Sequence, residues 1–286
     1  MKAAIIVNLS KEKAISCAGQ IVTLLREHGA SVAMPIECKG HFRSSSITYY
    51  YSLRQLLAHS DAAITVGGDG TIIHAAKYAA RTDTPLIGVN VGRLGFAADV
   101  ETEEIDSLAR LVTGDYNVES RLLLDVEVIK DGVSRHYLAV NDAVVAHGQL
   151  SKIIDMSLSL DGEEISKYRA DGLLCSTPTG STAYSLSAGG PILSPQMRCI
   201  LMTPVCPHSL FSRSVVFDEE SELSVTVKIP LDCSCVLTVD GEENIDIQEE
   251  DSVIIRRSEQ TLKLISLKKR NFYKKLNEKL KEREIK

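Results

Sequence analysis

A glycine-rich loop contains the residues best suited to chemistry, because it separates a buried strand from a helix. Residues 67–71 read Gly-Gly-Asp-Gly-Thr, after the apolar run 62–66 and before the helical pattern of residues 71–80. Glycines let the backbone approach a ligand closely, and the unpaired N–H groups at a helix start attract an anion. The loop therefore predicts a phosphate site.

The acidic residue in this loop, Asp69, limits the reactions that the loop could support. A carboxylate repels a phosphate unless it holds a magnesium ion or accepts a proton from an attacking hydroxyl. The alternative is structural, because an Asp at this position can simply cap the helix. The loop also lacks the Gly-Lys-Ser/Thr end of a Walker A motif and the G-x-G-x-x-G spacing of a dinucleotide fingerprint. These residues alone leave both interpretations open.

A second glycine loop follows the next predicted strand. Residues 88–96 read Gly-Val-Asn-Val-Gly-Arg-Leu-Gly-Phe, with Asn90 and Arg93 as the polar candidates. Loops at the carboxyl ends of parallel strands open into the same crevice, where α/β sheets bind ligands. The alternative is a plain turn.

Two later segments favour a nucleotide pocket. Asn141 and Asp142 interrupt the apolar strand 137–146, where each polar side chain needs a partner or a ligand. The alternative is a β-bulge in which both side chains are satisfied. The strand 172–176 enters a Pro-Thr-Gly-Ser turn, and a short helix rich in hydroxyls and small residues follows up to residue 191. Small side chains leave room for a bulky group, so this segment predicts a nucleoside site.

The elements around these motifs change character near residues 118–121. Near-continuous apolar strands alternate with helices in the first part, which indicates a parallel sheet covered by helices: strands 3–7, 31–36, 62–66 and 85–89, and helices 11–27, 50–59 and 71–80. Beyond residue 122, alternating strands and Asp-Gly turns at 131–132, 161–162 and 240–241 predict antiparallel hairpins. We expect strands at 122–130, 137–145, 153–160, 223–229, 235–239 and 262–267. The fold class is a Rossmann-like α/β domain, residues 1–120, followed by a β-rich, antiparallel sandwich-like domain, residues 121–267. The tail, residues 268–286, is expected to pack back on the first domain.

Composition and charge exclude several classes of protein. The 286 residues are 44% hydrophobic and carry a net charge of −6, which is typical of an ordinary globular protein. The tail holds nine Lys/Arg and three Glu, a balance of +6, so the remainder carries −12 and is unsuited to binding nucleic acid. No apolar run reaches the roughly 18 residues of a membrane span, so no membrane partner and a cytoplasmic location are expected.

Four segments in this order resemble the bacterial type of the NAD kinase family. They are the Gly-Gly-Asp-Gly loop, the Asn141-Asp142 pair, the Pro-Thr-Gly-Ser-Thr-Ala-Tyr segment at 178–184, and Asp240-Gly241. Residues 177–191 are the most specific part, and the resemblance extends over about residues 3–265. It implies Mg²⁺-dependent transfer of the γ-phosphoryl group of ATP to the adenosine ribose 2′-hydroxyl of NAD, giving NADP and ADP.

The resemblance also implies roles for individual residues. Asp69 would accept the proton of the hydroxyl, and no side chain is assigned as a metal ligand. The residues expected at the bound nucleotides are Gly68, Gly70, Thr71, Arg93, Phe96, Asn141, Asp142, Arg169, Asp171, Thr182, Ala183, Tyr184, Ser187 and Asp240. Asp142 stands where many members have Glu. The family forms homodimers or homotetramers with shared active sites, and Asp171 would reach the nicotinamide end in a neighbouring subunit.

Two other functions fit part of the sequence. A lipid kinase of the diacylglycerol or sphingosine type resembles this chain in its glycine loop, but the acidic body and residues 177–191 argue against it. A non-catalytic nucleotide-binding regulator could keep the same pocket, although the presence of Asp69 favours an enzyme.

Overall fold

The chain folds into two compact units, which are described separately here. The computed structural model describes residues 1–42, 44–92, 98–148, 153–209, 212–230, 233–268, 272–274 and 276–277. The first unit comprises Met1–Ser120 and Thr261–Lys286, and the second comprises Arg121–Gln260. The sequence placed residues 261–267 in the second domain instead. They belong to the first unit because the last strand continues into it and pairs there through Leu264 with Leu86.

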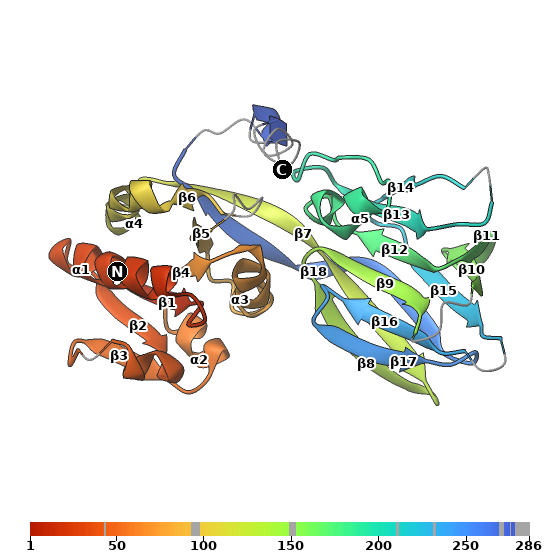
Figure 1. The fold of residues 1–286 in the computed structure, drawn as a ribbon, viewed down its shortest axis with the longest axis horizontal. Helices are drawn as coiled ribbons and strands as arrows, with labels where there is room; N and C mark the ends of the chain where they lie inside the picture. The colour runs from red at the N-terminus through yellow and green to blue at the C-terminus, as the bar shows by residue number, and fades with distance from the viewer. Residues whose placement is uncertain are drawn as a thin grey trace. The chain divides into compact units, whose positions relative to one another are not determined.

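The first unit contains a parallel sheet with the strand order β5-β4-β1-β2-β3. Its strands are β1 (Lys2–Val7), β2 (Ser31–Pro35), β3 (Ile47–Tyr50), β4 (Ala62–Gly67) and β5 (Leu86–Asn90). The short strand β6 (Val100–Glu101) and the end of β18 (Ser252–Ser266) pair with β5. The order of connection reverses between β1 and β4, so this sheet has its switch point there (Figure 1).

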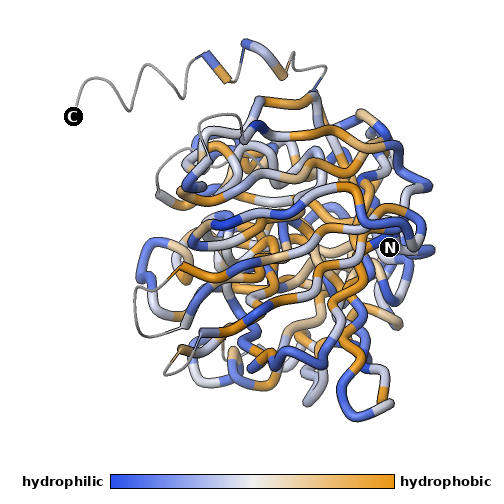
Figure 2. Tube along the Cα trace, turned by 90° about the vertical axis from the view of Figure 1, so that its right-hand side faces the viewer, coloured by the Kyte–Doolittle hydropathy of each residue, from blue (hydrophilic) through white to orange (hydrophobic). Residues whose placement is uncertain are grey.

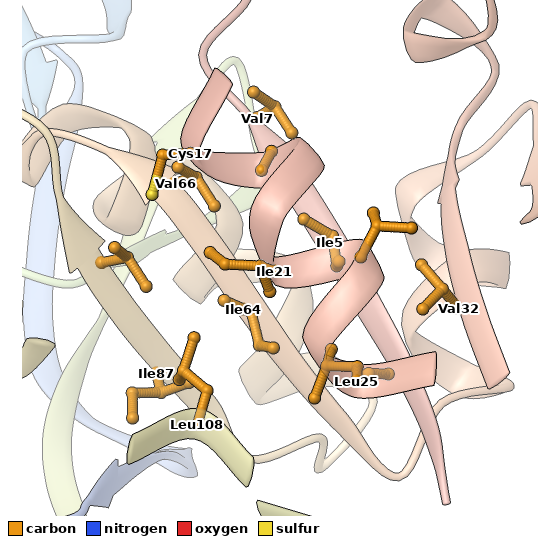
Figure 3. Close-up of a cluster of buried hydrophobic side chains, with 14 of the residues drawn as sticks. Ile5, Val7, Cys17, Ile21, Leu25, Val32, Ile64, Val66, Ile87 and Leu108 are labelled. Atoms are coloured by element: carbon orange, nitrogen blue, oxygen red, sulfur yellow. The ribbon is translucent and has the colours of Figure 1, made fainter. Parts of the chain in front are cut away.

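Helices cover the faces of this sheet as right-handed crossovers require. They are α1 (Glu12–Glu27), η1 (Ile36–Gly40), α2 (Leu53–Ala58), α3 (Asp69–Arg81), η2 (Thr102–Ala109) and α4 (Arg110–Thr113). Helix α1 packs against η2, while α2 packs against α3. Figure 3 shows the core beneath α1, where Ile21 and Leu25 face the sheet residues Ile5 and Ile64, all fully buried. The helix predicted at 50–59 is shorter, because Ile47–Tyr50 instead pairs with β2 as a strand.

The second unit consists of two antiparallel sheets that enclose a shared apolar core. Its strands are β7 (Asn117–Lys130), β8 (Val133–Ala139), β9 (Asp142–His147), β10 (Ile154–Leu160), β11 (Glu163–Ala170), β12 (Gly172–Ser176), β13 (Cys199–Val205), β14 (Val215–Asp218), β15 (Leu223–Lys228), β16 (Cys235–Val239), β17 (Glu243–Ile247) and the first part of β18. One sheet has the order β14-β13-β12-β9-β16-β17, and the other contains β11-β10-β15-β18 with β7 and β8. The predicted α/β and antiparallel sandwich architectures are both confirmed.

The Asp-Gly turns form as the sequence predicts. Both residues of each pair at 131–132, 161–162 and 240–241 have φ between +51° and +85°, the left-handed backbone of a tight hairpin turn. In Figure 2, hydrophobic residues (orange) recur along the strands and hydrophilic residues (blue) gather at the turns. Within the described part of the chain, no helix has the length and apolar character needed to cross a membrane.

The strand predicted over residues 137–145 is wrong, because the chain changes sheet within it. β8 ends at Ala139 and pairs with β7, whereas β9 begins at Asp142 and pairs with β12 and β16. Val140 and Asn141 form the crossing. The elements η3 (Gly180–Thr182) and α5 (Tyr184–Ser187) then follow β12, as the short helix expected there.

Of the tail, only Lys268, residues 272–274 and residues 276–277 lie within the described residues. Lys268 forms an ion pair with Glu104 of η2. The other tail residues, 269–271, 275 and 278–286, lie outside the described residues, and the expectation for them stays a prediction.

Candidate functional site

The glycine loop, Gly67 to Thr71, connects β4 to α3 in the first unit. Gly68 is the N-cap and Asp69 is the first residue of the helix, so Asp69 does not cap it. A Cβ on Gly67 would lie 2.4 Å from Thr71 Oγ1, which explains why glycine is required there. The 13-residue helix α3 begins at Asp69, and the N–H of Gly70 in its first turn is suited to a phosphate, whereas the N–H of Thr71 donates to the carbonyl of Gly68 at 3.0 Å.

Two other loops lie beside the glycine loop. Asn8, directly after β1, donates from Nδ2 to Thr71 Oγ1 at 3.4 Å, and its Oδ1 accepts from the backbone N–H of Ser10 at 3.1 Å. After β5, the N–H of Val91 donates to the carbonyl of Gly67 at 2.8 Å. The carboxyl ends of β1, β4 and β5 thus form one edge with three adjoining loops.

Asn90 ends β5 at this edge and is buried. Its Nδ2 donates to Glu101 Oε2 at 2.8 Å, while its Oδ1 has no hydrogen-bond partner among the described residues. A buried amide oxygen without a partner is unfavourable unless a ligand or water reaches it. The predicted site residues Arg93 and Phe96, which follow in the chain, lie outside the described residues.

The second unit contains a pocket of 450 Å³, called here the acceptor pocket. Its lining residues are Asn141, Asp142, Val144, Ala146, Ala183, Tyr184, Thr238, Asp240 and Gly241. Five of the predicted nucleotide residues therefore meet in one place. Asp142, Val144 and Ala146 share a face of β9 because successive strand residues point to opposite sides.

Asp240 does not project freely into this pocket, since its carboxylate binds the backbone of the crossing segment, residues 140–142. Its Oδ2 accepts from the N–H of Val140 at 2.9 Å, and its Oδ1 accepts from the N–H groups of Asn141 and Asp142 at 2.7 and 3.1 Å. Three hydrogen bonds to one carboxylate fix the backbone here, and they thereby fix the directions of the Asn141 and Asp142 side chains. Asp240 thus positions these two residues.

Thr177 holds the same segment through its carbonyl groups. Its Oγ1 donates to the carbonyl of Val140 at 2.8 Å, and its N–H donates to the carbonyl of Asn141 at 2.8 Å. Gly180 packs so closely that a Cβ there would lie 2.1 Å from the Asn141 carbonyl oxygen. The crossing segment is therefore held by hydrogen bonds to its N–H groups, by hydrogen bonds to its carbonyl groups, and by the close packing of Gly180.

Asp142 has an unusual environment for a carboxyl group. Its side chain is 5% exposed. Burial, together with the nearby Asp240 carboxylate, raises the pKa of Asp142 to about 7. Asp142 is consequently close to its titration midpoint near neutral pH, where it can donate or accept a hydrogen bond within the pocket.

The parent protein is expected to become less stable as the pH rises, and the Asp142→Asn variant is expected not to show this loss. With its pKa raised to about 7, folded Asp142 holds a proton that the unfolded chain releases above about pH 4. The contribution is full below that pH and is lost as the pH rises through about 7, by up to about 4 kcal/mol. Urea unfolding between about pH 5 and pH 8 should show the parent losing stability relative to the variant, and parallel profiles would contradict this.

The remaining predicted residues do not line the acceptor pocket as described. Thr182 is buried and donates from its hydroxyl to the carbonyl of Thr179 at 3.3 Å, and Ser187 is exposed on α5. Arg169 Nε lies 3.8 Å from Asp155 Oδ1 on the neighbouring strand β10. Asp171 Oδ1 lies 3.9 Å from His147 Nε2.

The sequence did not single out Thr177, Val144, Ala146 or Thr238. Period-two spacing from Asp142 would have found Val144 and Ala146, and the same spacing backward from Asp240 would have found Thr238. Nothing in the sequence indicated that Thr177 binds residues 140 and 141, because the two segments are 36 positions apart or more.

Comparisons with known proteins identify the family to which this chain belongs. The family model of the ATP-NAD kinase N-terminal domain matches residues 3–116, and that of the C-terminal domain matches residues 140–267. The NAD kinase of Natranaerobius thermophilus is 36% identical over 278 residues, which are 96% of each chain. The NAD kinase of Carboxydothermus hydrogenoformans is 40% identical over 224 residues, covering 78% of this chain and 80% of that one.

Solved structures share the fold. Yeast NADH kinase, crystallised with NADH, matches with a TM-score of 0.87 at 24% identity and covers 98% of this chain and 87% of its own. An NAD kinase from Archaeoglobus fulgidus in complex with ATP matches with a TM-score of 0.77 at 24% identity, covering 98% and 99%. The resemblance drawn from the four motifs is confirmed by the family models and the relatives of nearly full length. This chain belongs to the ATP-NAD kinase family, and its activity is the phosphorylation of NAD.

Proposed function

We propose that the glycine loop binds the phosphates of ATP, and that the acceptor pocket binds the adenosine part of NAD. Two features carry this proposal. An acid, Asp69, lies at a helix start suited to phosphate, and the lining of the acceptor pocket includes five predicted nucleotide residues. Each of the two units therefore has its own task in the reaction.

The chemical step requires few protein groups. The 2′-oxygen of the adenosine ribose attacks the γ-phosphorus, the bond from that phosphorus to the bridging oxygen breaks, and ADP leaves. Asp69 accepts the proton that the hydroxyl releases. Because the transferred group needs positioning and charge compensation more than covalent help, one acid, a phosphate-binding loop and a Mg²⁺ ion form a minimal set.

The acceptor pocket suits a nucleoside in size and polarity. A volume of 450 Å³ falls within the usual range of ligand pockets, about 300–1,000 Å³. The Asn141 amide and the Asp142 carboxyl supply hydrogen bonds, the small Ala183 leaves room for a ring, and the half-exposed Tyr184 ring offers a stacking surface. We assign these four residues to the adenine and ribose of NAD.

The oxygen atoms near the glycine loop fit a Mg²⁺ ion that arrives with its triphosphate. Among the described residues, no three His, Cys, Asp or Glu side chains cluster as a complete metal site. Mg²⁺ usually takes one or two carboxylates together with substrate phosphates. The amide oxygen of Asn90 has no partner among the described residues, and the neighbouring Glu101 carboxylate accepts from Asn90 Nδ2, so we assign these two groups to the ion. When bound, Mg²⁺ would neutralise charge on the transferred phosphate.

Arg169 and Asp171 belong to a further part of the proposal. Neither residue lines the acceptor pocket described for its own chain, and the Asp171 side chain is 40% exposed. A role in the site of a neighbouring copy, within a homodimer or homotetramer, is consistent with this placement. This assembly and the cytoplasmic location stay predictions.

The function is tested by supplying competing acceptors. Purified protein with ATP and Mg²⁺ is given either NAD or lipid micelles containing diacylglycerol or sphingosine, and NADP is measured with an NADP-specific dehydrogenase. We expect NADP to accumulate with ADP and no phosphorylated lipid to form. Lipid phosphorylation without NADP would favour the lipid kinase, and NAD binding without any transfer would favour a non-catalytic regulator.

A further inference from the structure

Lys11 brings a positive charge to the glycine loop from a different part of the chain. Residues 67–71 themselves contain no Lys or Arg. The Nζ atom of Lys11 lies 3.7 Å from the position of a Cβ on Gly68 and 3.5 Å from that of a Cβ on Gly92. The ammonium group therefore lies over two glycine positions, in the space that their missing side chains leave open.

The topology independently points to this place. Lys11 follows β1 and the glycine loop follows β4, and the sheet reverses its order of connection between these two strands. Ligands of open α/β sheets bind beyond the carboxyl ends of the strands at this switch point. The loop that carries Lys11 is held there, because the N–H of Lys11 donates to the carbonyl of Asn8 at 3.2 Å and Asn8 contacts Thr71.

The position of Lys11 is unfavourable for the fold itself. It is the N-cap of the 16-residue helix α1, where the helix dipole repels a cation and where Ser, Thr, Asp or Asn would be preferred. Its side chain makes no capping bond, and its ammonium has no hydrogen bond or ion pair with any of the described residues. The Lys11 side chain is exposed, so its ammonium is open to an anionic ligand.

We propose that Lys11 binds a phosphate oxygen of the triphosphate donor and offsets the charge that builds up there during transfer. This inference rests on the proposed function of the glycine loop as the donor side. An ammonium ion is a compact charge with three donors, which suits a phosphate oxygen at the start of α3, beside the N–H of Gly70. Lys11 thereby supplies the cation that the glycine loop lacks.

The test compares Lys11→Met and Lys11→Arg with a matched control, Lys13→Met, in which an exposed lysine of the same helix is removed. Steady-state rates are measured against ATP and against NAD, and the inhibition constant of inorganic triphosphate is measured against ATP. For Lys11→Met, we expect kcat/KM for ATP to fall about 10- to 100-fold, with a matching rise in the triphosphate inhibition constant. KM for NAD should stay within about 3-fold of the parent value, because the acceptor is not contacted.

The other variants distinguish a bound phosphate from a structural effect. Lys11→Arg should recover most of the activity, because it keeps the charge, and Lys13→Met should match the parent. The melting temperature of Lys11→Met should equal or exceed that of the parent, since a cation is removed from the positive end of a helix dipole. Parental ATP kinetics for Lys11→Met would overturn the proposal.

The proposed function can fail separately. If the parent forms no NADP, calorimetric titration with inorganic triphosphate still decides the role of Lys11. Tighter binding by the parent than by Lys11→Met would support it, and equal binding or no binding by the parent would overturn it.

Discussion

Asp69→Asn is expected to lower kcat for NADP formation by about 10²- to 10⁴-fold, the usual contribution of a positioned general base. The amide keeps the shape of the side chain but cannot accept the proton of the ribose hydroxyl. KM for NAD should change little, because the residues assigned to NAD lie in the second unit. Steady-state kinetics with both substrates measure the two effects separately.

The structure provides a control for the charge change itself. Asp106→Asn removes an exposed carboxylate from η2 in the same unit and should leave kcat unchanged. Asp69 also lies in the first turn of α3, where a negative charge stabilises the helix by about 0.3–1 kcal/mol. The melting temperature of Asp69→Asn should therefore fall only slightly. An Asp69→Asn protein with parental kcat would remove Asp69 from the mechanism.

Asp240→Asn is expected to impair both the stability of the protein and its binding of NAD. The carboxylate accepts hydrogen bonds from three partly buried N–H groups of residues 140–142, and an amide replaces one accepting oxygen with a donor that opposes them. Losing charge-assisted bonds of this kind costs about 2–4 kcal/mol. Because Asn141 and Asp142 lose their fixed direction, KM for NAD should rise at least about 10-fold at a temperature where the variant is folded.

Two further variants separate positioning from a general loss of charge. Asp246→Asn removes an exposed carboxylate from the adjacent strand β17 and should behave like the parent. Gly180→Ala changes no charge, but its Cβ would lie 2.1 Å from the Asn141 carbonyl oxygen and must displace the crossing segment. It should raise KM for NAD in the same way. Unchanged stability and KM in Asp240→Asn would contradict the positioning role.

The parallel sheet of the first unit could be predicted because its buried strands have a strong local pattern. Residues 62–66 and 85–89 are near-continuous apolar runs, and they form Ala62–Gly67 and Leu86–Asn90. The Asp-Gly turns were equally predictable, since few other residue pairs adopt two successive left-handed conformations. In both cases, the residues that determine the structure are neighbours in sequence.

The elements that depend on distant partners could not be predicted. Residues 137–145 read as one strand because their apolar pattern is continuous, yet the break at Val140 and Asn141 is held by Asp240, about 100 positions later. Strand β3 exists through its pairing with β2, and its sequence, Ile-Thr-Tyr-Tyr, has no clear alternation of buried and exposed residues. Strand β18 extends back to Ser252, ten residues before the predicted start, because it pairs with β15.

The same limit applies to the candidate site. Motifs located Asp69, Asn141, Asp142, Ala183, Tyr184 and Asp240, but they could not distinguish a residue that contacts a ligand from one that holds the backbone. Asp240 was predicted at the nucleotide, and its three bonds to residues 140–142 add a positioning role. Lys11 carries no motif, and only the folded sheet brings it to Gly68.

The central claim, transfer of phosphate to the ribose 2′-hydroxyl of NAD, is tested most directly by identifying the position of the new phosphate. The reaction with ATP and Mg²⁺ is followed by ³¹P nuclear magnetic resonance, with NAD or with an analogue in which hydrogen replaces the adenosine 2′-hydroxyl. We predict that NAD gives a 2′-phosphomonoester and ADP in equal amounts, and that the analogue gives neither. A phosphate at any other position of NAD, or an analogue phosphorylated as fast as NAD, would contradict this account.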